Sequence, residues 1–321
     1  MNYQMTGVEF MAKKSLWIIT IVLSIISIFV GVIDINIFNL TSEDLQVLMI
    51  SRFPRLISIL VAGVGMSISG VIMQQISNNK FISPSTAATV DSAKLGVLFS
   101  MIIFTSASIF QKMILAFIFS VTGTFIFMTI LKKIKIKNVI FIPLVGIMLG
   151  NVIGSITDFF AYRFNLNQSM GAFLQGSFST VLKGNYEILY LSIPLVIIAF
   201  SYVHKFTLAG MGEEMSISLG LNYKRVTNLG VVIVALISSL VVITVGSLPF
   251  VGLIIPNIVS IWKGDNLKTN MPLVALLGAS FVLVCDIISR VIIAPYEVPI
   301  NLTIGVIGAV IFLYLILRRN N

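Results

Sequence analysis

His204–Arg225, with the sequence HKFTLAGMGEEMSISLGLNYKR, is the one long polar break in a chain that is otherwise almost entirely apolar. Its two glutamates would occupy the first turn of a short helix, where the helix dipole favours negative charge. Such a helix is too short to be stable alone, so it would need a groove in a partner to lie in. The residues that define this predicted helix, at about 212–221, are Gly212, Glu213, Glu214, Met215, Leu219 and Gly220. The alternative is an ordinary polar loop, and spacing alone does not separate the two.

The composition of the whole chain indicates a membrane protein. Of its 321 residues, 57% are hydrophobic and 10% are charged, and the mean hydropathy is +1.05. A soluble domain carries about 25% charged residues, so this chain has too few polar residues to form a water-exposed surface. Its apolar segments are long enough for transmembrane helices, whereas a β-barrel would show short alternating segments. We therefore predict an all-α, polytopic membrane protein in which residues 1–321 form a single transmembrane domain.

Ten apolar segments are predicted to cross the membrane. The eighth, Phe250–Trp262, is short and broken by a proline, so it either crosses fully or is re-entrant. A short helix is also predicted at Ala172–Ser179, in the linker between the fifth and sixth spans. The ten spans are Leu16–Ile33, Leu56–Ile76, Ala93–Ala107, Met113–Leu131, Val139–Tyr162, Ile188–Val203, Leu229–Ser247, Phe250–Trp262, Pro272–Ile293 and Leu302–Leu317. Spans two to five and seven to ten could form an inverted pair, as in many transporters, but the sequence shows no convincing repeat.

The basic residues predict the orientation of these spans. Ten spans place both termini on one side, and if that side is the cytosol, 15 of the 21 Lys and Arg residues lie inside. Membrane topology therefore accounts for the formal net charge of +9, and no nucleic-acid partner is predicted. The chain has one cysteine, Cys285, and one histidine, His204, which are too few ligands for a metal or haem site built on these residue types. No cofactor is therefore predicted. We expect a multi-pass protein of the cell membrane with both termini in the cytosol.

The fifth predicted span carries a stripe of polar residues at spacings of four, three and four, which places them on one helix face. They are Asn151, Ser155, Asp158 and Tyr162. Because hydrogen-bonding groups that face lipid are costly, we predict that this face lines a solvated transport path. Three glycines at intervals of four residues lie beside the stripe, and we interpret them as sites of close helix packing. They are Gly146, Gly150 and Gly154.

Three arginines, Arg52, Arg55 and Arg290, are predicted at the outer ends of their spans. Guanidinium groups there could receive carboxylates from an extracellular partner. The alternative is that they reach out to lipid phosphates. Arg290 follows Asp286 by four residues, so an ion pair within the ninth span is expected, with the Arg290 head group exposed outside.

Motifs of several enzyme classes are missing from the chain. The patterns GxxxxGK[ST], HExxH and GxSxG do not occur. The chain is therefore not predicted to be an enzyme, and transport against a gradient would need an external source of energy.

Seven short motifs, in one order along nearly the whole chain, resemble those of the iron-siderophore and cobalamin permeases of the FecCD type. Arg52–Arg55 is similar to the family's R-x-P-R, and Ser69–Gln74 is similar to its S-G-x-x-x-Q. The other five motifs are Phe173–Phe178, Gly212–Gly220, Phe250–Pro256, Asp286–Arg290 and Glu297–Pro299. These permeases are the membrane subunits of binding-protein-dependent ABC importers.

The resemblance implies the architecture of a type II ABC importer permease. Two permease subunits, either two copies of this chain or this chain and a paralogue, would surround one path. A cytosolic ATPase dimer would receive the Glu213–Gly220 helix, and an extracellular substrate-binding lipoprotein would offer acidic residues to Arg52, Arg55 and Arg290. The fifth and tenth spans and the Ala172–Ser179 helix would line the path. The cargo would be a ferric siderophore, with haem or cobalamin as alternatives.

Three positions depart from the family pattern. Asn78–Ile82 replaces N-P-L-A, Asn257 replaces the histidine after Pro256, and Asn301 replaces a glycine. These departures resemble the branch associated with ferric catecholate-type siderophores. The first of them lies where the cytosolic gate is expected.

Two functions of other classes stay open from the sequence. A secondary transporter driven by an ion gradient would need a buried carboxylate near the midplane, and Asp158 and Asp286 are predicted closer to the helix ends. An intramembrane enzyme would need a His-bearing or paired-carboxylate site, which the sequence does not offer.

Overall fold

The computed structural model describes residues 2–31, 41–104, 106–134 and 141–319, and the chain in these ranges is built from helices. The long helices are α1 (Asn2–Phe29), α3 (Phe53–Ile76), α4 (Thr89–Ile103), α5 (Ile109–Lys133), α6 (Phe141–Arg163), α8 (Ser192–Ser201), α11 (Tyr223–Val245), α12 (Val251–Lys263), α13 (Leu267–Val291) and α14 (Ile300–Arg319). The short ones are α2 (Ser42–Val47), a π-helix (Leu48–Arg52), α7 (Asn167–Leu174), a 3-10 helix (Glu187–Leu191), α9 (Val203–Ala209) and α10 (Glu213–Ser218). The all-α prediction is confirmed.

Each of the ten predicted spans corresponds to a helix. In the part of the chain that the structure describes, five helices are long and apolar enough to cross a membrane, and the pair Glu187–Ser201 and Val203–Ala209, bent by 63°, makes a sixth if it is one span. The remaining four predicted spans correspond to α1, α4, α12 and α14. Parts of the first, third and fifth predicted spans, and of the basic turn after the fourth, fall on 32–40, 105 and 135–140 and lie outside the described residues.

The short helix predicted at Ala172–Ser179 is wrong in position. The chain forms α7 five residues earlier, at Asn167–Leu174, and Gly176 then adopts a positive φ of 64°. A left-handed residue ends a helix, because helical residues need negative φ. The segment after Gly176 turns instead toward α11, where the Ser177 amide donates to the Val245 carbonyl at 2.9 Å.

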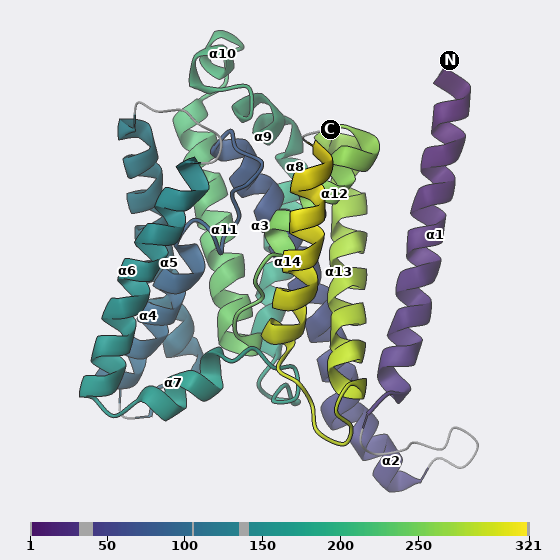
Figure 1. Cartoon of the computed structure of the whole chain (residues 1–321), viewed down its shortest axis with the longest axis vertical. Coiled ribbons are helices and arrows are strands. Elements are labelled where there is room, and N and C mark those ends of the chain that lie inside the picture. The colour runs from purple at the N-terminus through teal and green to yellow at the C-terminus, as the bar shows by residue number, and fades with distance from the viewer. Residues whose placement is uncertain (1, 32–40, 105, 135–140, 320–321) are drawn as a thin grey trace.

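The ends of the helices divide the molecule into two sides (Figure 1). α10 lies at one end together with both chain termini, and α2 and α7 lie at the other. Loops predicted to share a side contact each other: Lys80 pairs with Asp265 at the α10 end, and the Lys183 amide donates to Ile50 at the α7 end. We call these the α10 end and the α7 end.

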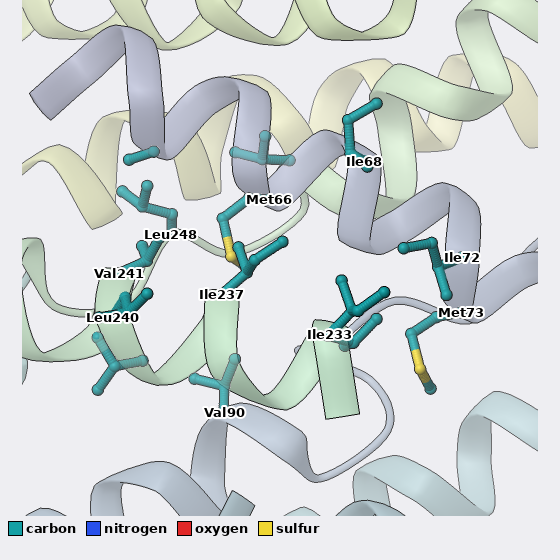
Figure 2. Packing of buried hydrophobic residues seen from close by; sticks show 14 of the residues in the cluster. Met66, Ile68, Ile72, Met73, Val90, Ile233, Ile237, Leu240, Val241 and Leu248 are labelled. Atoms are coloured by element: carbon teal, nitrogen blue, oxygen red, sulfur yellow. The ribbon is translucent and has the colours of Figure 1, made fainter. Parts of the chain in front are cut away.

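α3 and α11 run antiparallel through the bundle (Figure 1) and contribute more buried residues to the core than any other two helices. Met66 and Ile72 of α3 face Ile233 and Ile237 of α11, and Val90 of α4 closes one side (Figure 2). These side chains are at most 3% exposed. Fully burying an aliphatic side chain stabilises by about 1.5–3 kcal/mol, so this contact fixes the positions of the surrounding helices.

The helices after α3 and after α11 follow the same order of lengths. α3–α6 have 24, 15, 25 and 23 residues, and α11–α14 have 23, 13, 25 and 20. Each short helix follows a left-handed residue, Ala88 or Phe250. α4 packs against α11, and α12 packs against α3. Since α3 and α11 are antiparallel, the structure shows the inverted pair that the sequence left open.

The short helices α4 and α12 begin inside the bundle. A Cβ atom on Gly252, in the first turn of α12, would lie 2.8 Å from the Met66 carbonyl, about halfway along α3. The irregular segment after α11 therefore enters the bundle from the α7 end before α12 starts. The helix of the eighth predicted span thus covers only part of the thickness, as its 13 residues suggest.

Candidate functional site

The polar break at His204–Arg225 forms the helix that was predicted there. Gly212 has a φ of 100°, and α10 follows at Glu213–Ser218. The Ser216 hydroxyl donates to the Leu208 carbonyl at 2.7 Å, which fixes α10 on α9. Two apolar side chains near its outer surface, Met215 and Leu219, are 58% and 54% exposed.

An ion pair connects this helix to the bundle. Lys132, in the last turn of α5, lies 3.6 Å from Glu213 and above the ring of Tyr223. Both partners of the ion pair are about half exposed, so it orients α10 more than it stabilises the fold. Exposed Met215 and Leu219 beside two first-turn glutamates make a surface suited to docking in a groove. The coupling role of this surface stays a prediction.

The three predicted docking arginines lie together at the α7 end, but they are buried. Arg55 donates to Asp286 at 2.8 Å and to Glu297 at 2.8 Å, and the Asp286 side chain is fully buried. The expected pair of Arg290 with Asp286 is present at 2.5 Å. The motifs Arg52–Arg55, Asp286–Arg290 and Glu297–Pro299 thus contribute to one cluster of charged side chains.

The prediction that the Arg290 head group is exposed is wrong, since its side chain is 1% exposed. Its guanidinium donates to the carbonyls of Ser27 and Val30, at the end of α1, at 2.8 and 2.6 Å. Arg52 donates to the same Val30 carbonyl at 2.5 Å. Cations at a helix C-terminus satisfy its last carbonyls and its dipole, which explains why α1 covers these groups. Docking of a binding protein at these arginines stays a prediction.

The polar stripe of α6 lies on the outside of the described chain. Asn151, Ser155, Asp158 and Tyr162 are all exposed, and Ser155 donates to the Asn151 carbonyl within the helix. Of the adjacent glycines, Gly146 and Gly150 pack closely, since Cβ atoms there would lie 2.0 Å from the Thr86 carbonyl and 2.6 Å from Asp91 Oδ2. A Cβ on Gly154 would meet nothing within 4 Å. The stripe is therefore available to a second subunit or to a path between subunits.

A group at the α10 end, which motif reasoning did not single out as a site, links the two inverted halves. Lys80 reaches Asp265 at 2.6 Å and Ser260 at 3.0 Å, and the Asn257 side chain donates to the Lys80 carbonyl at 2.8 Å. Beside it lies a cavity of about 220 Å³, also lined by Phe312. Lys80 and Asn257 are two of the positions that depart from the family pattern, which is the signal that could have identified the group.

The comparisons with known proteins agree on one family. The FecCD transport family matches residues 19–318. The petrobactin import system permease protein YclN of Bacillus subtilis (strain 168) is 58% identical over 312 residues, covering 96% of this chain and 99% of that protein. The petrobactin permease FatD of Bacillus anthracis is 39% identical, covering 94% and 90%. The ferric-anguibactin permease FatD of Vibrio anguillarum is 40% identical, covering 84% and 85%.

One solved structure shows the same fold. It is described as a metal-chelate type ABC transporter in an inward-facing conformation, and it matches with a TM-score of 0.80. The match covers 95% of this chain and 98% of that one at 23% identity, so it supports the fold alone.

Proposed function

Because the chain belongs to the FecCD transport family, we propose that it is the permease subunit of an ABC importer that carries ferric siderophores into the cell. The observation that carries this proposal is the 58% identity to a petrobactin import permease over nearly the full length of both chains. Petrobactin and anguibactin permeases among the relatives favour a ferric siderophore over haem or cobalamin as the cargo.

The arrangement of the helices supports a division of roles. The α10 end would face the cytosol, where Met215 and Leu219 would enter a groove on an ATPase dimer. The α7 end would face outward, and a substrate-binding lipoprotein would dock over the arginine cluster there. The exposed stripe of α6 would line the path against a second copy of the chain or a paralogue. Movement of α10 would reach α5 through Lys132 and α11 through Tyr223.

An ABC importer is driven by ATP hydrolysis and a secondary transporter by an ion gradient, so the energy source of uptake distinguishes the two. When the permease is reconstituted in liposomes with its ATPase and binding protein, uptake of a ferric catecholate chelate should require ATP and stop with vanadate. An uncoupler should leave uptake unchanged, and the permease alone should carry no cargo. Uptake by the permease alone, or uptake that an uncoupler abolishes and vanadate does not, would contradict the proposal.

Charge reversal at the predicted coupling helix should uncouple the importer. We expect Glu213→Lys combined with Glu214→Lys to lower ATP-driven uptake about tenfold, because the changes place cations at the helix N-terminus and in the proposed interface. The measurements are ATP hydrolysis stimulated by the loaded binding protein and uptake in the same liposomes.

The control for this experiment is Lys268→Glu, which reverses an exposed charge in the first turn of α13, outside α10. The Lys132–Glu213 pair is too exposed for its loss to unfold the protein, and an unchanged melting temperature would confirm this. Normal coupled uptake by the Glu213 and Glu214 variant would refute the coupling role.

A further inference from the structure

Two charged residues of α4, Asp91 and Lys94, lie near the middle of the membrane thickness. A Cβ on Gly123 of α5 would lie 1.8 Å from Ser92, and a Cβ on Gly150 of α6 would lie 2.6 Å from Asp91. With a rise of 1.5 Å per residue, these contacts lie about 14–15 Å from the α10 ends of both helices. A bilayer core about 30 Å thick therefore has its centre close to Asp91.

The two charged residues form an ion pair in the first turns of α4. Lys94 Nζ lies 3.1 Å from Asp91 Oδ1, and the other carboxylate oxygen points toward Gly150 of α6. The side chains of Lys94 and Asp91 are 24% and 25% exposed. The pair is thus held on one side by α6 and is accessible on another side.

An accessible ion pair at this depth does not face lipid without a large cost. The other partly exposed residues of the same α4 face are apolar: Leu95, Phe99, Met101 and Ile102. Phe99 contacts Phe160 of α6 with ring centroids 5.5 Å apart, while the space beside Gly154 is open. The accessible side of the pair is therefore next to the polar stripe of α6, which the proposed function assigns to the transport path.

We propose that Lys94 contacts anionic groups of the cargo as the cargo passes the middle of the path, and that Asp91 positions the Lys94 ammonium. This inference rests on the proposed function and adds a specificity-determining residue to it. A lysine ammonium has three donors, and Asp91 occupies one of them. The N-terminus of α4, which begins within the membrane, adds positive potential at the same level.

The chemical class that fits is an anionic ferric chelate with carboxylate or catecholate oxygens. Asp91 partly neutralises the ammonium, so the cargo is attracted but not trapped. Asp91 also keeps the ammonium at the α4 surface beside α6. A cation at the middle of the path offsets part of the hydration that an anionic complex loses as it passes between the helices.

The test uses the complete importer in liposomes, with loaded binding protein at saturation and a ferric catecholate as cargo. Lys94→Met, which keeps the length of the side chain and removes the charge, should lower the uptake rate about tenfold, since hydrogen bonds to charged groups contribute about that factor or more. Lys94→Arg should restore most of the rate, and Asp91→Asn should give an intermediate rate. Lys268→Met, at an exposed lysine in the first turn of α13, is the control and should match wild type.

Two further measurements separate a cargo contact from a structural role. Permease assembly on size exclusion should be the same for Lys94→Met, Lys94→Arg and wild type, and Lys94→Arg should keep the wild-type melting temperature. Equal uptake by Lys94→Met and wild type would overturn the inference, as would equal impairment of Lys94→Arg and Lys94→Met. Loss of assembly in Lys94→Met would also overturn it, because the pair would then hold two subunits together. If the wild-type importer takes up no ferric chelate, the proposed function itself fails.

Discussion

Replacement of Asp286 by leucine should destabilise the protein by about 3–5 kcal/mol, since it leaves buried arginines without their shared counter-charge. The Asp286 side chain is fully buried between Arg55 and Arg290, at 2.8 and 2.5 Å. Arg55 keeps Glu297, but Arg290 keeps only neutral partners among its described contacts, the backbone and hydroxyl groups of Ser27 and Val30. Thermal or denaturant unfolding of the detergent-solubilised protein measures the loss.

The control for this change is Asp265→Asn, which removes a charge from an ion pair whose two side chains are 38% and 66% exposed. Its effect should stay within about 1 kcal/mol, because solvent screens such pairs. A loss of less than 1 kcal/mol for Asp286→Leu would contradict the burial of the cluster. Because substitutions in this cluster destabilise the fold, an experiment that tests the arginines for docking must also measure the stability of each variant.

Replacement of Gly70 by alanine should destabilise the protein by about 1–3 kcal/mol and should also impair transport. A Cβ at this position would lie 1.9 Å from the Gly252 carbonyl oxygen, so α3 and α12 would have to move apart. The clash involves backbone atoms, which cannot move away as a side chain can. The melting temperature and the uptake rate should both fall.

The matched control is Gly154→Ala, also within a membrane helix, where the new Cβ meets nothing within 4 Å of the described chain. Alanine has a higher helix propensity than glycine, so the isolated permease should keep or slightly gain stability. If Gly154→Ala impairs assembly of the importer, this position contacts another subunit. Equal stability of Gly70→Ala and wild type would show that α3 and α12 are not in close contact.

Helices and their order could be predicted from the sequence because long apolar segments between polar breaks have few alternatives in a bilayer. α10 was predictable because Gly212 and the glutamates that follow mark a helix start. The inverted pair could not be predicted, because α3 and α11 occupy equivalent positions in the two halves but have no recognisable sequence similarity. The start of α4 and α12 inside the bundle depends on close contacts at Gly123 and Gly252, which hydropathy does not reveal.

The candidate sites were predicted in part. The spacing of Asp286 and Arg290 predicted their ion pair, but nothing local indicated that Ser27 and Val30 would cover the guanidinium. Lys94 is one of the 15 basic residues that the sequence places on the cytosolic side, and this placement is wrong, because α4 begins inside the bundle and carries Asp91 and Lys94 near the middle of the membrane. For groups of this kind, the sequence tells which charges are present, and the tertiary contacts decide which of them water can reach.

The position of α1 has a consequence for biosynthesis. α1 packs mainly against α13, the Thr20 and Ser280 hydroxyls of these two helices lie 2.8 Å apart, and Arg290 reaches the Val30 carbonyl. Arg290 follows Val30 by 260 residues, so the ribosome completes this anchor long after α1 has entered the membrane. The first helix to be inserted is thus among the last to be fixed, and in nascent chains that stop before α13, α1 should keep the Arg52 contact to Val30 but lack its main packing partner.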